Sequence, residues 1–170
     1  AFHRLDMLHQ DLKPGNIMLS EEGTIKIIDF GSTRIAGIAD VASPVERKKL
    51  LGTREFTAPE YLLDEHAEMQ ADQFSLGSII YQLLSGQLPY GKGFEKQMNR
   101  QQLSRLSYQS LCLQRSDIPI WVDKAIEKSV QLQPKRRYEA LSEFQHDLQK
   151  PNPAFLHEQY LPIIERHPLR

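Results

Sequence analysis

Four polar residues in the first part of the chain are of types that could carry out chemistry together. Asp11, Lys13 and Asn16 stand close together in one segment, and Asp29 follows in the triplet Asp-Phe-Gly. A carboxylate can accept a proton from a hydroxyl, and an ammonium group can neutralise phosphate charge. An amide oxygen and a second carboxylate are hard ligands suited to a divalent cation. A loop that points these side chains into one cleft would combine a base, a cation and a metal site.

A short β-hairpin is predicted to position these residues. Apolar residues at 17–19 and 25–28 are separated by the polar turn at 20–23, a pattern typical of two paired strands. The second strand runs directly into Asp29, so this carboxylate is expected at a strand end. Side chains that follow a rigid strand in this way often serve function.

A long loop is predicted after the hairpin. Residues 32–57 include several glycine, proline and basic residues and have no sustained apolar period. Loops of this length inside a domain are usually functional or disordered. The loop is expected to end at Ala58-Pro59-Glu60, where a proline in the first turn can start a helix.

The remainder of the chain is predicted to be helical. The segment after Asp72 is apolar on nearly every side and ends at Gly86, which indicates a helix buried at the centre of the domain. Apolar residues recur at helical spacing in two later segments, and a shorter helix is expected between them. These three segments are Trp121–Val130, Leu141–Leu148 and Lys96–Leu106. The start, Ala1–Leu8, has apolar residues at helical spacing but no capping residue, so it reads as a helix cut within its length.

The composition narrows the class of protein. The 170 residues carry 21 Lys+Arg against 22 Asp+Glu, a formal net charge of −1, which argues against nucleic acid as the main partner. Cys112 is the only cysteine, so an intrachain disulfide or a cysteine-based zinc cluster is excluded. It has no neighbouring histidine or basic residue to activate its thiol and is interpreted as a packing residue. No apolar run is long enough for a membrane span.

Several motifs occur in an order that resembles the helical C-terminal lobe of eukaryotic-type (Hanks-type) protein serine/threonine kinases. They are His9-Gln10-Asp11-Leu12-Lys13-Pro14-Gly15-Asn16, Asp29-Phe30-Gly31, Gly52-Thr53, Ala58-Pro59-Glu60, Asp72-x-Phe-Ser-Leu-Gly77 and Arg137. The resemblance implies a mainly α fold with a short β-hairpin that carries the catalytic and metal-binding loops. It covers residues 1–150, and the proline-containing residues 151–170 are expected to be a C-terminal tail or linker.

The resemblance also assigns roles in phosphoryl transfer from ATP to a protein Ser or Thr hydroxyl. Asp11 matches the catalytic base, Lys13 the lysine that stabilises the transferred group, and Thr53 the threonine that bridges them. Asn16 and Asp29 match the ligands of Mg²⁺ or Mn²⁺. Met18 falls where the family places an apolar surface under the adenine ring.

Five further residues match structural positions of the family. His9 is expected to pack against Phe30. Glu60 and Arg137 resemble a buried ion pair that ties the activation segment to the helical lobe. Asp72 resembles the carboxylate that holds the backbone of the catalytic loop.

Two departures from the family pattern matter. Gln10 stands where most kinases have arginine, and a neutral side chain cannot pair with a phosphorylated activation loop. The glycine-rich loop and the strand lysine that bind nucleotide do not occur in these residues, so an N-terminal lobe from an upstream segment is an expected partner.

The finer resemblance is to bacterial kinases fused to a metal-dependent protein phosphatase domain. In that group a membrane helix follows the tail, so the kinase is expected on the cytoplasmic face, with membrane contact only through a helix beyond Arg170. Two alternatives remain open from the residues. One is a pseudokinase or docking module that binds a partner without phosphoryl transfer, and the other is a carboxylate-metal hydrolase. The metal ligands argue against the first, and the long loop and Thr53 are unexplained by the second.

Overall fold

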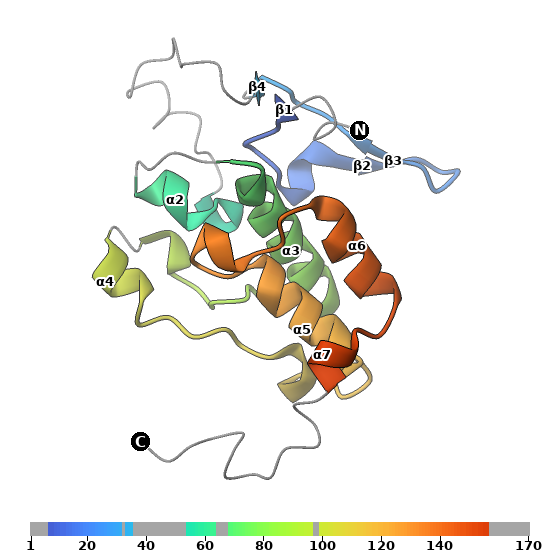
Figure 1. Cartoon of the computed structure of the whole chain (residues 1–170). Helices are drawn as coiled ribbons and strands as arrows, with labels where there is room; N and C mark the ends of the chain where they lie inside the picture. The colour runs from blue at the N-terminus through green and yellow to red at the C-terminus, as the bar shows by residue number, and fades with distance from the viewer. Residues whose placement is uncertain (1–6, 32, 36–53, 64–67, 97–98, 157–170) are drawn as a thin grey trace.

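The computed structural model describes residues 7–31, 33–35, 54–63, 68–96 and 99–156 of the chain. A bundle of helices forms the lower body, and two small sheets lie beside it (Figure 1). The strands are β1 (Met7–Leu8), β2 (Ile17–Leu19), β3 (Ile25–Ile27) and β4 (Arg34–Ile35). The α-helices are α2 (Pro59–Leu62), α3 (Met69–Ser85), α4 (Arg100–Leu103), α5 (Ile120–Ser129), α6 (Leu141–Gln149) and α7 (Pro153–Leu156). Short 3₁₀ helices are η2 (Pro14–Asn16), η3 (Arg54–Phe56), η4 (Phe94–Lys96), η5 (Leu111–Leu113) and η6 (Pro134–Arg136).

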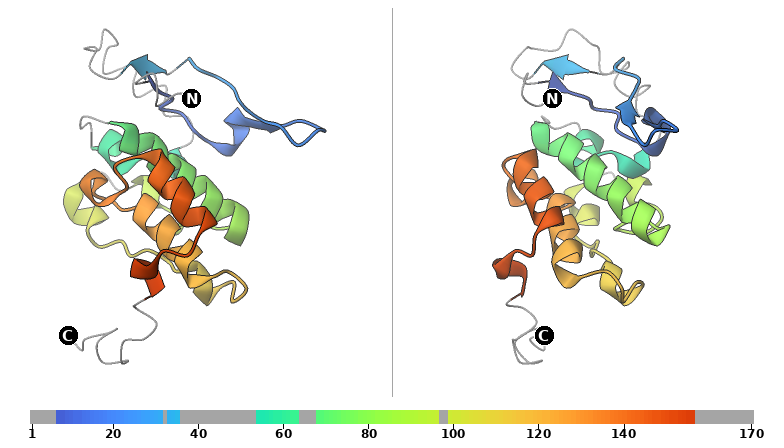
Figure 2. Two further views of the ribbon diagram at one scale, coloured as in Figure 1. Left: turned by 45° about the vertical axis from the view of Figure 1, so that its right-hand side comes forward. Right: turned by 90° about the vertical axis from the view of Figure 1, so that its right-hand side faces the viewer.

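The predicted β-hairpin is confirmed. β2 and β3 pair antiparallel, with Ile17 opposite Ile27 and Leu19 opposite Ile25. The Gly23 N–H donates to the Ser20 carbonyl at 2.9 Å and closes the turn. Figure 2 shows the hairpin extending away from the helices. As a result, the strands are anchored to the body mainly at the end that carries the polar residues of interest.

A second sheet was not predicted. β1 pairs antiparallel with β4, with Met7 opposite Ile35 and Leu8 opposite Arg34. The expectation of a helix over Ala1–Leu8 is therefore wrong for its last two residues, while residues 1–6 lie outside the described part of the chain. The helical spacing there was misleading because strand pairing with a distant segment leaves no local signal. β4 and η3 also interrupt the predicted 32–57 loop, and residues 32 and 36–53 lie outside the described part of the chain.

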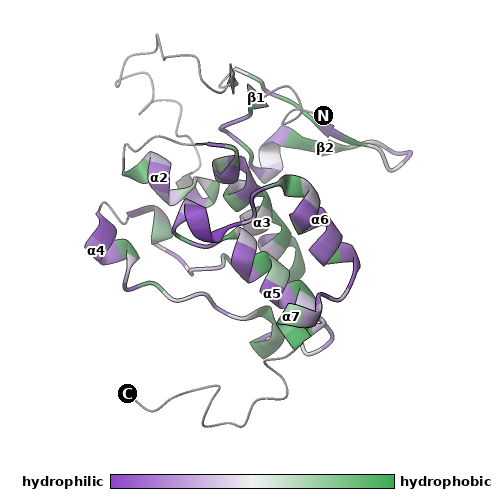
Figure 3. Ribbon diagram, in the orientation of Figure 1, coloured by the Kyte–Doolittle hydropathy of each residue, from purple (hydrophilic) through white to green (hydrophobic). Residues whose placement is uncertain are grey.

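The central helix is α3. It contacts β1, η3, η5 and α5, and its buried residues point to several sides, as its apolar sequence predicts. Phe74 and Tyr81 are fully buried on it. The helix ends at Gly86, which adopts φ = 71° as its C-cap, a conformation that glycine adopts readily. Figure 3 shows α3 mostly green and white beyond its purple first turns, whereas α4 and the visible side of α6 carry purple, hydrophilic turns.

The helices α5 and α6 confirm the two predicted amphipathic segments. They pack on each other and, with α3, enclose a cluster that includes Leu111, Ile126 and Phe144. α7 belongs to the same body, because Phe155 packs against this cluster and the Asn152 side chain donates to the Asp147 carboxylate at 3.0 Å. The beginning of the predicted tail is therefore held on the helical body, and the domain boundary at residue 150 stays a prediction.

The predicted helix over Lys96–Leu106 is shorter than expected. α4 is one turn, capped by Asn99, whose Oδ1 accepts the Gln102 N–H at 2.9 Å. The segment that follows is held by buried Asp123, which accepts hydrogen bonds from Ser110 and from the Leu111 N–H. Polar anchors of this kind fix a weakly periodic segment without regular structure. Within the described residues, no helix has both the length and the hydropathy needed to cross a membrane.

We predict that Gly77→Ala destabilises the domain through the contact of α3 with the end of α5. A Cβ at Gly77 would lie 2.1 Å from Ser129 Oγ and 2.8 Å from Val130 Cγ1. Both neighbours are fully buried, so the loss should be about 1–3 kcal/mol of unfolding free energy, as for other overpacked cores. Gly15→Ala is the control, because an added Cβ there meets nothing within 4 Å. Equal denaturant midpoints for the two variants would contradict the prediction.

Candidate active site

Asp72 holds the loop that carries the predicted base. This carboxylate is buried in the first turns of α3, and its oxygens accept the backbone N–H groups of His9 and Gln10 at 2.7 and 2.9 Å. Gln10 adopts φ = 67°, a left-handed conformation of the kind that costs on the order of 1–3 kcal/mol in a residue with a side chain. The two charge-assisted hydrogen bonds offset that strain. They fix the turn after which Asp11 follows.

Asp11, Lys13 and Asn16 form one cluster, as their spacing predicted. Lys13 Nζ lies 2.6 Å from Asp11 Oδ2. The Asn16 side-chain amide donates to the Asp11 carbonyl at 2.8 Å and to its Oδ2 at 3.1 Å. The Asp11 and Lys13 side chains are 18% and 23% exposed. The carboxylate is therefore oriented by two donors but remains accessible to a substrate.

His9 links this cluster to the segment that carries Asp29. The Asp11 N–H donates to His9 Nδ1 at 3.4 Å, so Nε2 carries the ring proton and donates to the Ile28 carbonyl at 3.2 Å. The His9 ring also meets the Phe30 ring edge-on, with centroids 5.3 Å apart. The predicted packing of His9 against Phe30 is present. His9 has a structural position and does not face the Asp11 side chain as a second base.

Asn16 and Asp29 are joined through the backbone. The Ile28 N–H donates to the Asn16 carbonyl at 2.9 Å, and Asp29 follows with φ = 62°. The strained conformation turns the Asp29 side chain, which is exposed and accepts the Gly31 N–H at 3.4 Å. Asparagine and aspartate tolerate this region better than other residues. Non-glycine residues at positive φ precede Asp11 and occupy position 29, and such strain clusters at functional sites.

Asn16 and Asp29 carry side-chain oxygens of the type that Mg²⁺ binds. Both hydrogen bonds from Asn16 use its amide nitrogen, so its side-chain oxygen remains an acceptor. The described residues contain no group of three or more His, Cys, Asp or Glu arranged for a metal. Magnesium commonly takes only one or two protein ligands and completes its shell with water and phosphate oxygens. This donor set therefore suits a metal that arrives with a phosphorylated substrate.

Met18 lies on the exposed face of the hairpin. Met18 is 54% exposed, and Leu19, Ile25 and Phe30 are exposed as well. Large apolar side chains gathered on one projecting hairpin mark a surface suited to an apolar ring or to a partner. The structure thus places Met18 where an apolar contact could form next to Asn16.

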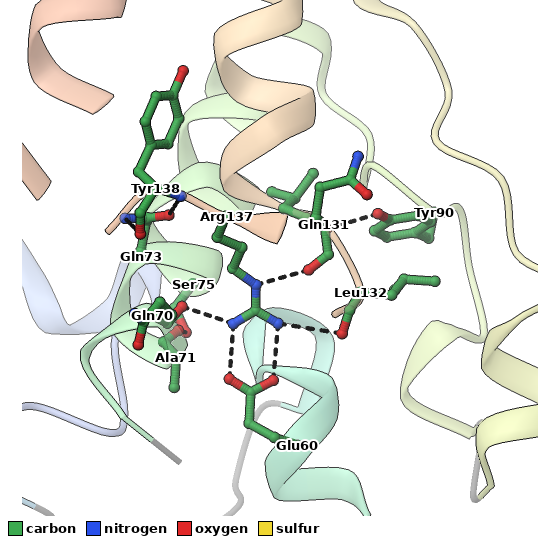
Figure 4. Close-up of polar contacts among 11 residues, drawn as sticks. Glu60, Gln70, Ala71, Gln73, Ser75, Tyr90, Gln131, Leu132, Arg137 and Tyr138 are labelled. Carbon is green, nitrogen blue, oxygen red and sulfur yellow. Dashed lines mark hydrogen bonds and ion pairs between the residues drawn. The ribbon is translucent and has the colours of Figure 1, made fainter. Parts of the chain in front are cut away.

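Arg137 and Glu60 form the predicted buried ion pair (Figure 4). Arg137 Nη1 and Nη2 donate to the two Glu60 carboxylate oxygens at 2.7 and 2.8 Å. The remaining donors reach the carbonyls of Gln131, Gln70 and Leu132. The guanidinium also stacks 5.0 Å from the centroid of the Phe74 ring. Because every donor is satisfied, the charge can be buried between α2, α3 and the connection from α5 to α6.

The structure separates the predicted site residues into two groups. Asp11, Lys13, Asn16 and Asp29 lie at the loop and the hairpin end that follows it. Glu60 lies in α2 and pairs with Arg137, and Asp72 on α3 holds the backbone of the loop. Thr53 lies outside the described residues. Gln73 was missed by sequence reasoning, although it is 2% exposed and pairs with the Tyr138 backbone. Because α3 also contains Gln70 and Gln82, the sequence held no signal that singled out Gln73.

Comparison with known proteins identifies relatives of this chain. The chain is 30% identical over 146 residues to the Bifidobacterium longum protein named probable serine/threonine-protein kinase PknB, which covers 86% of the chain. It is 32% identical over 166 residues to serine/threonine-protein kinase PknK of Mycobacterium bovis, covering 96% of the chain. It is 37% identical over 90 residues to serine/threonine-protein kinase PknL of Mycobacterium tuberculosis, covering 53% of the chain.

The chain spans only 21%, 15% and 22% of the length of these three relatives. The protein kinase domain family matches residues 1–149, which contain every described site residue. The mostly helical architecture with a short hairpin is that expected for the helical lobe of a kinase. The chain belongs to the protein kinase family and represents part of a serine/threonine kinase catalytic domain.

Proposed function

We propose that the protein containing this chain transfers the γ-phosphoryl group of ATP to serine and threonine hydroxyls of protein substrates. The observation that carries the proposal is the cluster in which Lys13 and the Asn16 amide orient one carboxylate oxygen of Asp11. The Asp11 side chain is also 18% exposed, so a substrate hydroxyl can reach this carboxylate. Kinases of this family use ATP with Mg²⁺, and their substrates are proteins.

In the proposed mechanism, Asp11 accepts the proton of the substrate hydroxyl as the oxygen attacks the γ-phosphorus. Lys13 lies 2.6 Å from Asp11, so its ammonium group can also reach charge that develops on the transferred phosphoryl group. The oxygens of Asn16 and Asp29 would hold Mg²⁺, which supplies charge neutralisation to the phosphates when it is bound. The new bond joins the hydroxyl oxygen to phosphorus, and the bond to ADP breaks.

An N-terminal lobe is the proposed partner for the exposed apolar side chains of the hairpin. Met18 is 54% exposed and Leu19 71% exposed, and covering them would supply both an adenine contact and an interface between lobes. The support is their position next to Asn16 and the family resemblance. We also propose a cytoplasmic location, with any membrane contact made by a helix beyond Arg170 and with the kinase fused to a phosphatase domain. The resemblance to bacterial phosphatase-fused kinases supports this proposal.

Phosphorylation of the loop is not expected to switch this kinase on. Gln10 has a neutral side chain, and its Nε2 is buried without a hydrogen-bond partner among the described residues. A phosphate needs a cation to order a segment. We therefore predict that Ser43→Ala, in a segment outside the described residues, changes the specific activity of the full-length protein by less than about twofold. A large fall in the initial rate would contradict the prediction.

The test of the proposed function is the chemical identity of the product. Full-length protein incubated with γ-labelled ATP, Mg²⁺ and casein should yield labelled phosphoserine and phosphothreonine after acid hydrolysis. Label confined to phosphotyrosine would contradict the assignment. Absence of any labelled amino acid would favour the docking-module alternative.

A further inference from the structure

Gln73 makes an unusual pair of hydrogen bonds with the backbone of a distant residue. It is 2% exposed in the first turns of α3. The Tyr138 N–H donates to Gln73 Oε1 at 3.0 Å, and Gln73 Nε2 donates to the Tyr138 carbonyl at 3.3 Å. Figure 4 shows this pair beside the Arg137 guanidinium. One side-chain amide therefore satisfies both backbone groups of a buried residue, as a neighbouring strand would.

The position of Tyr138 sets the position of Arg137, which precedes it directly. The Arg137 guanidinium is a rigid planar fork, and it meets the two Glu60 oxygens in parallel at 2.7 and 2.8 Å. A backbone shift of about 1 Å at this point would lengthen these bonds beyond the range of good hydrogen bonds. The connection from η6 to α6 has no regular structure of its own, so its register depends on contacts of this kind.

We infer that Gln73 is a positioning residue for the protein-substrate side of the site: it fixes the Tyr138 backbone against α3 and so aims Arg137 at Glu60. The inference rests on the proposed kinase function. Glu60 lies in α2, seven residues after Thr53, the position that the resemblance to kinases places beneath the protein substrate. Asp72, the preceding residue in α3, holds the loop of Asp11 instead. Asp72 and Gln73, adjacent in one turn of α3, thus position the loop of Asp11 and the Glu60–Arg137 pair respectively.

Other contacts hold the Tyr138 ring but not its backbone. The Tyr138 hydroxyl donates to Asp147 Oδ2 at 3.0 Å, and Lys128 Nζ lies 4.0 Å from the ring centroid. These contacts would survive loss of the Gln73 amide. A variant at position 73 is therefore expected to fold, with the ring in place and the backbone around Arg137 loosened.

The experiment compares Gln73→Met with Tyr81→Phe in the full-length protein. Methionine keeps the length of the side chain and removes both hydrogen bonds. Tyr81 is a matched control on the same helix, because its buried hydroxyl donates to the Gln109 carbonyl at 2.8 Å and accepts from Gln114 Nε2 at 3.1 Å. Among the described residues, no hydrogen bond or ion pair joins Tyr81 to Arg137 or Glu60, so Tyr81→Phe reports a loss of stability alone.

Two readouts decide the inference. With casein as substrate, Gln73→Met should raise the KM for protein about five- to tenfold, with KM for ATP and kcat within about twofold, because substrate binding rather than chemistry is affected. Hydrogen exchange measured by mass spectrometry should become faster at residues 59–63 in Gln73→Met and not in Tyr81→Phe. Unchanged KM and unchanged exchange at α2 would overturn the inference. If the parent protein labels no substrate, the proposed function fails, and the exchange comparison alone decides the role of Gln73.

Discussion

Arg137→Ala is expected to lower the thermal midpoint of the domain by roughly 6–20 °C. The substitution leaves Glu60 as an unpaired carboxylate that is 2% exposed, and breaking a buried pair in this way costs about 3–5 kcal/mol. In a domain of this size each kcal/mol moves the midpoint by about 2–4 °C. The carbonyls of Gln131 and Gln70 lose their donor at the same time. Differential scanning calorimetry of the full-length protein measures the effect.

Arg115→Ala is the matched control for this experiment. Arg115 also makes two hydrogen bonds to one carboxylate, that of Asp117, at 2.8 and 2.7 Å. That pair is exposed to solvent, where screening and side-chain entropy leave little net stabilisation. The thermal midpoint of the Arg115→Ala variant should therefore differ little from that of the parent protein. A midpoint for Arg137→Ala equal to that of Arg115→Ala would contradict the account of the buried pair.

Asp11→Asn is expected to reduce kcat by on the order of 10²- to 10⁴-fold, the range typical of losing a general base. The variant keeps the size of the side chain but cannot accept the hydroxyl proton. The backbone contacts that shape the loop use the Asp72 carboxylate and are unaffected. Initial rates of phosphoryl transfer at saturating ATP and casein measure the effect, with the thermal midpoint recorded alongside.

Glu21→Gln is the control for the charge change at position 11. Glu21 is an exposed carboxylate in the turn of the same hairpin, and its neutralisation also removes one negative charge. Its kcat should equal that of the parent protein. If Asp11→Asn retained kcat within about threefold, Asp11 would not be the base.

The hairpin and the longer helices could be predicted because each is formed by residues close together in the sequence. The hairpin followed from apolar runs on either side of a polar turn, and α3, α5 and α6 followed from apolar residues at helical spacing. The clustering of Asp11, Lys13 and Asn16 followed from their closeness in one short loop. In these cases the positions of the side chains are set by residues only a few places away.

Contacts between distant segments could not be predicted in the same way. β1 pairs with β4, which lies on the other side of the hairpin in the sequence. The two-residue segment Met7–Leu8 contains no sign of that partner. Gln73 and Tyr138 are 65 residues apart, and neither residue type indicates the other. The Glu60–Arg137 pair, 77 residues apart, was expected only through the resemblance to kinases, because a charged residue in a sequence does not reveal whether it will be buried.

Asp29 is expected to belong to a phosphoryl-transfer site and not to a hydrolase or a scaffold. The most direct measurement is the fate of the γ-phosphate when full-length protein and its Asp29→Asn variant are incubated with γ-labelled ATP, Mg²⁺ and casein. The parent is expected to place label on protein and the variant to lose this transfer, since one of the two proposed magnesium ligands is weakened. Label released only as inorganic phosphate, or equal labelling of protein by parent and variant, would contradict this role of Asp29 in phosphoryl transfer.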